Sequence, residues 1–203
     1  MAASFLTAVL DLLVPPRTTD KVVRSVSIEE LQALLHPTTG MLPYHDPRVT
    51  ALVWELKYHA HPRAKALAGE LLFEQLLAIA AEELGQPLLI PIPMHAARRK
   101  TRGHNQTELL CTAALTHTGS TFEYAPRVLE RVKETAPQQG LERHKRLKNV
   151  QGSMNTVDPS AVAGRVCVVV DDVTTTGATL EEARRALLKA GAARIHVVAL
   201  AHS

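Results

Sequence analysis

The chain has 203 residues, of which 46% are hydrophobic and 21% are charged, and its formal net charge is +3. This composition is typical of an ordinary globular domain, and it excludes a disordered tail, a collagen-like chain and a disulfide-stapled scaffold. One Trp, three Tyr and three Phe are too few rings to favour binding of single-stranded nucleic acid by base stacking.

The first segment of the chain is apolar over residues 4–14. It lacks a basic leader, contains Asp11 and ends at Pro15–Pro16, so it does not fit a signal peptide. No window approaches the roughly 18 consecutive apolar residues of a membrane span. We therefore expect a cytoplasmic protein without a membrane segment, in which Cys111 and Cys167 are buried, reduced thiols.

Residues 1–85 are predicted to be helical. Ser27–Glu30 has the pattern of a capping box at the start of a short helix. Asp46 followed by Pro47 predicts an N-cap with proline at the first helical position. A third helix is predicted over 63–84, with Gly85 as its C-cap.

Residues 86–203 alternate apolar stretches of strand length with helical patterns, which is typical of βαβ construction. Leu88–Ile90 is a predicted buried strand and 106–117 a predicted helix. The strands over 127–132 and 150–157 are predicted partners, joined by a long charged loop over 133–148. We expect an α/β fold with a mainly parallel sheet, joined to the helical region 1–85 in one compact domain.

The last unit has the clearest pattern. Residues 165–170 form an uninterrupted apolar strand, as expected at the centre of a parallel sheet that is covered on both faces. Asp171–Val173 end this strand, 174–179 make a turn, and a helix over 180–190 leads to a last strand over 195–201. The turn is then at the carboxyl edge of the sheet, where open α/β sheets bind ligands.

The residues of this turn favour a phosphate. Small hydroxyl side chains and a glycine before a helix provide hydroxyls, backbone N–H groups and the positive end of the helix dipole. Asp171 and Asp172 would repel a polyphosphate, but they suit the hydroxyls of a sugar whose phosphate lies in the turn. The pattern therefore indicates a phosphorylated ribose. It is neither a Walker loop nor a dinucleotide-binding glycine pattern.

Val168–Thr179 resembles the 5-phosphoribosyl pyrophosphate (PRPP) motif of type I phosphoribosyltransferases. Four further segments, in the same order along the chain, resemble the ComF family: Leu56–Tyr58; Pro91–His95 with Arg98; Arg102–Gln106; and 131–138 with Arg146 and Asn149. The resemblance covers residue 45 to the C-terminus and implies the type I phosphoribosyltransferase fold, with residues 1–85 contributing a hood.

The resemblance implies transfer of phosphoribosyl from PRPP to a nitrogenous base, with release of pyrophosphate. It implies Mg²⁺ as the cofactor, held indirectly by Asp171 and Asp172 through PRPP or water. The 5′-phosphate site it implies is Thr174, Thr175, Thr176, Gly177, Ala178 and Thr179. It places Met94, His95, Arg98 and Arg102 at the pyrophosphate, and Asp171, Asp172, Arg102 and Lys133 in catalysis. Cations at 98–102 and 131–146 fit an anionic leaving group.

The chain departs from the family in two respects. Many members begin with a cysteine-rich zinc ribbon, and this chain has no cysteine before Cys111, so we expect no zinc bound by thiolates there. His104 stands where the family usually has an aromatic residue after the arginine–glycine pair.

Several alternatives stay open. The same pocket would serve a PRPP or nucleotide sensor without transfer activity, or an accessory protein in DNA uptake that binds DNA; another phosphorylated sugar is a third candidate ligand. The cations at 98–102 also fit a solvated charge cluster, and 133–148 a plain surface loop. Lys57 fits a helix dipole as well as a ligand, and Trp54 either borders the core or the base site. A homodimer is compatible with all of these.

Overall fold

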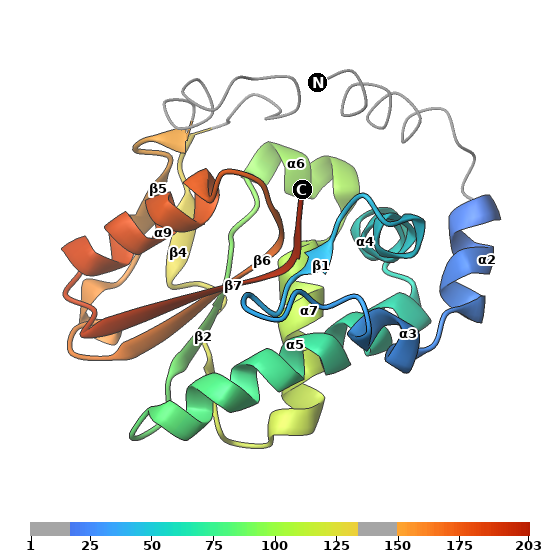
Figure 1. Ribbon diagram of the computed structural model, residues 1–203. Helices are drawn as coiled ribbons and strands as arrows, with labels where there is room; N and C mark the ends of the chain where they lie inside the picture. Colours follow the sequence, from blue (N-terminus) through green and yellow to red (C-terminus); the bar gives the residue numbers. More distant parts are fainter. Residues whose placement is uncertain (1–16, 134–149) are drawn as a thin grey trace.

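The computed structural model describes residues 17–133 and 150–203, and Figure 1 shows how their helices and strands are arranged. The helices are α2 (Arg17–Ser25), α3 (Ile28–Gln32), α4 (Pro47–His59), α5 (Pro62–Glu82), α6 (Ala96–Arg102), α7 (Gln106–Thr118) and α9 (Ala178–Lys189), with a short 3₁₀ turn at Pro159–Ala161. The strands are β1 (Leu42–Pro43), β2 (Leu88–Pro91), β3 (Glu123–Tyr124), β4 (Leu129–Arg131), β5 (Met154–Thr156), β6 (Val166–Thr174) and β7 (Arg194–His202).

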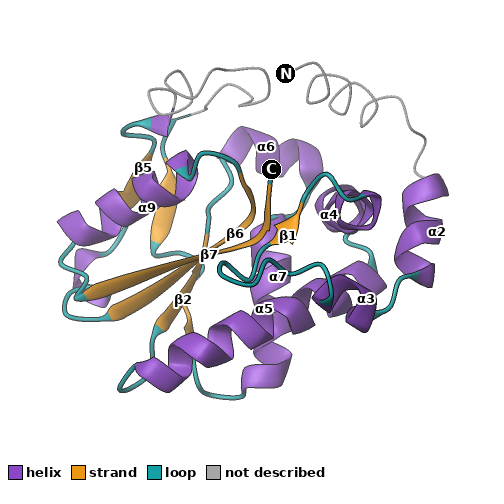
Figure 2. Ribbon diagram, in the orientation of Figure 1, coloured by secondary structure: helices purple, strands orange, loops and turns teal. Residues whose placement is uncertain are grey.

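A five-stranded sheet with the order β1-β7-β6-β2-β3 forms the centre of the fold. Every pair of neighbours in it is parallel, and helices flank the sheet (Figure 2). This confirms the predicted α/β class with a mainly parallel sheet. The predicted strands around 127–132 and 150–157 do pair: β4 and β5 form a separate antiparallel ribbon, with Arg131 opposite Met154.

The side chains at the centre of β6 pack against helices on both faces of the sheet. Val168 and Val170 pack into one apolar cluster with residues of α4, α5 and α7. Cys167 and Val169 point to the opposite face and pack with residues of α9. Successive side chains of a strand alternate between the faces, so one continuous apolar stretch fills two cores, as the sequence predicts. Cys167 is buried and has no disulfide.

The N-terminal helices begin as their capping residues predict. Ser27 and Glu30 form the capping box of α3. The Asp46 carboxylate accepts the Arg48 N–H at the start of α4. The predicted C-cap of α5 at Gly85 is wrong, because the helix ends at Glu82 and Glu83 is already extended. The Glu83 carboxylate is held instead by Arg194 at 2.8 Å and by His196 at 2.7 Å, both on β7.

Two further differences concern the sheet. β6 continues through Asp171–Thr174, where the sequence predicts its end, because β7 is long enough to pair Thr174 with His202. The helical N-terminal half also contributes β1 to the sheet, which pairs with β7 at its outer edge. The segment before Gly103, for which no helix is predicted, contains the helix α6. None of the described helices is long and apolar enough to cross a membrane.

Candidate functional site

Two adjacent carboxylates lie at the carboxyl end of β6. Asp171 and Asp172 are each 8% exposed, and the Asp172 N–H donates to Asp171 Oδ1 at 3.0 Å. Burial raises the pKa of Asp171 well above its ordinary value, and the neighbouring Asp172 carboxylate raises it further. The site therefore holds negative charge that the protein neutralises only in part.

The main cation facing this pair is Arg131, the last residue of β4. Its charge favours the ionised form of Asp171, and its Nε donates to the Pro93 carbonyl at 3.2 Å. Burial lowers the pKa of Arg131, while the charge of Asp171 acts in the opposite direction. Arg131 thus links the acid pair to the segment after β2. From the sequence alone, Arg131 is only one of several cations within residues 131–146.

The segment after β2 lies beside the acid pair because β2 and β6 are paired neighbours. The Ile92 N–H donates to the Val170 carbonyl at 2.9 Å, one residue before Asp171. The side chains of Asn105 and Thr107 both donate to the Ile92 carbonyl, at 3.0 and 2.7 Å. These buried hydrogen bonds fix the chain direction as it enters the Met94–His95 turn.

The helix that follows this turn separates the predicted pyrophosphate residues. Met94 and His95 precede α6, and His95 Nδ1 accepts the Ala97 N–H at 3.3 Å as its N-cap. Arg98, in the first turn of α6, is close enough for its charge to act on Arg131. Arg102 ends the helix, where its Nη1 donates to Gln106 Oε1 at 3.0 Å and its guanidinium lies over the Tyr58 ring.

The turn between β6 and α9 follows the acids directly. The Thr174 carbonyl, still in the strand, accepts the Ser203 N–H at 2.9 Å. Gly177 is the N-cap of α9 at φ +75°, and having no side chain it makes no side-chain cap. Thr176 Oγ1 lies 3.4 Å from the Ala178 nitrogen, which donates to it. The turn therefore presents hydroxyls and backbone at a helix N-terminus, the geometry that suits an anion.

Most of the predicted residues gather in one place. Asp171, Asp172, the loop 174–179, Met94, His95 and Arg98 all lie at the carboxyl edge of β2 and β6, the side where α6 crosses in Figure 1. Lys133 follows β4, and its Nζ lies 3.5 Å from the Gln151 carbonyl. Arg102 is at the far end of α6. Arg143, Lys145 and Arg146, predicted as cations of the long loop, fall outside the described residues.

The part of the chain that carries this turn is similar to a known domain family. Residues 115–203, which include β6, the turn and α9, match the family model described as "Phosphoribosyl transferase domain". DNA utilization protein YhgH of Salmonella typhi is 32% identical over 156 residues, which cover 75% of this chain and 66% of the relative. The Escherichia coli K12 protein of the same name is 33% identical over 155 residues, with 74% and 66% covered.

Competence protein F of Haemophilus influenzae is 34% identical over 119 residues, which cover 57% of this chain and 50% of the relative. The chain is a ComF homologue with a phosphoribosyl transferase domain. This confirms the resemblance drawn from its motifs. The match with the YhgH proteins spans 66% of their length, so what those longer proteins do as a whole does not transfer to this chain.

Two solved structures are similar to the ComF homologue. They are a glutamine PRPP amidotransferase from B. subtilis (18% identity, 72% of this chain and 30% of that one, TM-score 0.43) and a hypoxanthine phosphoribosyltransferase from Staphylococcus aureus (12%, 67% and 63%, TM-score 0.43). The strand order of the sheet and the family match define the fold class.

The donor set of the ComF homologue at this edge consists of two carboxylates. Within residues 17–133 and 150–203, no group of three or more His, Cys, Asp and Glu side chains could enclose a metal ion. Two adjacent carboxylates fit Mg²⁺, which keeps several waters and binds through one or two carboxylates together with the phosphates of a substrate. His61 caps α5 and contacts Asp20 at 3.0 Å.

Proposed function

We propose that this ComF homologue binds PRPP together with Mg²⁺ at the carboxyl edge of β6 and transfers phosphoribosyl to a nitrogenous base. One observation carries the proposal: two buried carboxylates end the central strand immediately before the turn that leads into α9. A phosphorylated ribose needs both the carboxylates and the turn at this spacing, because its hydroxyls and its 5′-phosphate lie at opposite ends of the sugar.

The parts of the site would act as follows. Asp171 and Asp172 orient the ribose hydroxyls, directly or through the waters of the metal, and residues 174–179 surround the 5′-phosphate. Mg²⁺, when bound, would supply positive charge between the ribose hydroxyls and the pyrophosphate. The raised pKa of Asp171, caused first by burial and then by the neighbouring Asp172 carboxylate, supports this assignment, because a bound cation would favour the ionised form of the pair.

The chemistry requires stabilisation of charge. A bond forms between the base nitrogen and C1 of the ribose while the bond from C1 to the pyrophosphate oxygen breaks, so positive charge develops on the sugar and negative charge on the leaving group. Met94, His95 and Arg98 lie at the edge that the pyrophosphate would occupy, with Arg131 behind them. Fixed cations aimed at a developing anion are an effective means of catalysis.

Release of pyrophosphate tests the proposal. The purified protein with PRPP and Mg²⁺ is expected to release pyrophosphate only when one member of a panel of nitrogenous bases is added. Asp172→Asn and Thr176→Val are each expected to lower turnover by at least about 100-fold, with unchanged circular dichroism. Full activity in either folded variant would remove the acid pair or the turn from the site.

The names of the relatives favour a second candidate, an accessory protein in DNA utilization or competence that binds PRPP or a nucleotide without transfer. This candidate predicts affinity for PRPP with no product from any base, and DNA binding that weakens steeply with salt. Base-dependent release of pyrophosphate would reject it. Competition between ribose 5-phosphate and PRPP distinguishes both candidate functions from a site that binds another phosphorylated sugar.

A further inference from the structure

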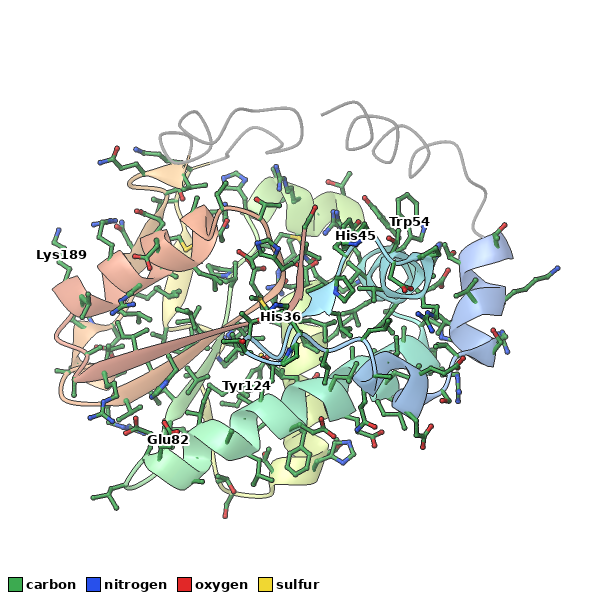
Figure 3. All side chains as sticks on the ribbon, viewed as in Figure 1. His36, His45, Trp54, Glu82, Tyr124 and Lys189 are labelled. Carbon is green, nitrogen blue, oxygen red and sulfur yellow. The ribbon has the colours of Figure 1, made fainter. Side chains whose placement is uncertain are left out.

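A cluster of rings and cations lies where α4 meets the end of α6; we call Trp54, Lys57, Tyr58 and Arg102 the aromatic–cation cluster. The Trp54 and Tyr58 ring centroids are 4.3 Å apart, with the rings tilted by 46°. Lys57 Nζ is 5.3 Å and the Arg102 guanidinium carbon 5.2 Å from the Tyr58 ring centroid. Tyr58 is 42% exposed, and Figure 3 shows Trp54 at the outside of α4.

The two cations of the cluster belong to those described Lys and Arg residues that form no ion pair with a carboxylate. Within the described residues, neither Lys57 nor Arg102 has a carboxylate within ion-pair distance, whereas Arg48 pairs with Asp46 and Arg99 with Glu108. The dipoles of α4 and α6 account for a cation in the last turn of each helix, but not for the placement of both cations against one ring. Two positive charges are therefore held beside the exposed Tyr58 ring, with no carboxylate of the described residues paired with them.

The cluster is rigidly placed relative to the acid pair. His104 Nε2 lies 3.2 Å from the Leu56 carbonyl, which ties the chain after α6 to α4. His95, at the other end of α6, follows the Pro93 carbonyl that Arg131 holds. The seven residues of α6 span about 10 Å, so one short helix connects the cluster to the segment that lies beside the acid pair.

We propose that the aromatic–cation cluster binds a planar aromatic ring carrying a negative charge, and that this ring is the acceptor base. The identification of this ring as the acceptor base rests on the proposed function. An indole ring offers a flat face for stacking, and Lys57 and Arg102 supply charge for a carboxylate on the ring. A neutral ring of the same shape would leave the charges of both cations without a counter-charge, so the cluster discriminates by charge.

The test uses Trp54, the only tryptophan of the chain, whose fluorescence reports on the cluster alone. Two pairs of probes differ only or mainly in charge: nicotinate against nicotinamide, and orotate against uracil. We expect saturable quenching by at least one of the acids, with the matched neutral ring binding at least about 10-fold more weakly. Lys57→Gln with Arg102→Gln should remove this preference, and Arg48→Gln, an arginine of α4 that pairs with Asp46, should keep it.

Other outcomes decide against the proposal. Equal quenching by charged and neutral rings, no quenching by any of the four, or an unchanged preference in the double variant would each overturn it. Binding of a short oligo-dT but of no free acid would also overturn it and would assign the cluster to a nucleic acid. Calorimetric titration of the same variants with PRPP distinguishes the two proposals. If the variants still bind PRPP, the assignment of the acid-pair site holds even where the proposal for the cluster is overturned.

Discussion

Replacing both acids by asparagine, Asp171→Asn with Asp172→Asn, is expected to make the unliganded protein more stable at neutral pH. Asn keeps an oxygen that can accept the Asp172 N–H, now bonded to Asp171 Oδ1, and it removes the repulsion between two buried charges. The expected gain is about 0.5–2 kcal/mol in the free energy of unfolding. For a protein of this size each kcal/mol raises Tm by about 2–4 °C.

The stability gained by the double variant is expected to depend on pH. The folded-state pKa of Asp171 is raised above its unfolded value, so its contribution to stability is fully present below the unfolded pKa and is lost as pH rises through the folded pKa. The advantage of the variant should therefore be small in acid and grow toward neutral pH, as urea unfolding at several pH values will show.

A control with the opposite sign is Asp158→Asn. Hydrogen bonds from Ser160 lower the pKa of the Asp158 carboxyl, so this variant should lose stability near neutral pH rather than gain it. A double variant of the acid pair that is less stable than the wild type at pH 8, or whose advantage is the same at pH 4, would contradict the account of Asp171 as an unbalanced buried charge.

Gly177→Ala is expected to weaken the binding of ribose 5-phosphate by about 10-fold or more. Gly177 has φ +75°, a left-handed conformation that costs a residue with a Cβ roughly 1–2 kcal/mol. An alanine relieves the strain by moving the backbone of the turn, and with it the N–H groups and hydroxyls proposed to surround the phosphate. Calorimetric titration with ribose 5-phosphate measures the effect.

Gly164→Ala is a matched control at the other end of β6. Gly164 has φ +73°, and a Cβ built at either glycine meets no atom within 4 Å. Both variants should therefore lose a similar amount of stability, and only Gly177→Ala should lose affinity. Equal affinities in the two variants would mean that the turn before α9 does not bind the phosphate.

Much of the fold could be predicted from local patterns. The apolar stretch before Asp171 predicts a strand covered on both faces, and alternate residues do fill two cores. Capping residues such as Ser27 and Asp46 predict helix starts because they act within three residues of themselves. The helix α6 had a detectable signal: basic residues in its last turn are followed by Gly103, which is left-handed at φ +82°.

The rest depends on contacts between distant parts of the chain. β1 has only two residues, and it is a strand because it pairs with β7, about 160 residues later. Glu83 ends α5 early because residues of β7 hold its carboxylate. Arg131 and the pairing of Arg102 with Tyr58 likewise join segments far apart in sequence. Periodicity and composition carry no information about such pairs, which explains why the aromatic–cation cluster was not predicted.

Calorimetric titration with PRPP and Mg²⁺, of the wild type beside Asp171→Asn with Asp172→Asn, tests the central claim most directly. The account predicts saturable binding to the wild type that requires Mg²⁺ and is lost in the folded double variant. A folded wild type that binds no PRPP, or a double variant that binds it as well as the wild type, would contradict the assignment of the acid pair and its turn as the PRPP site.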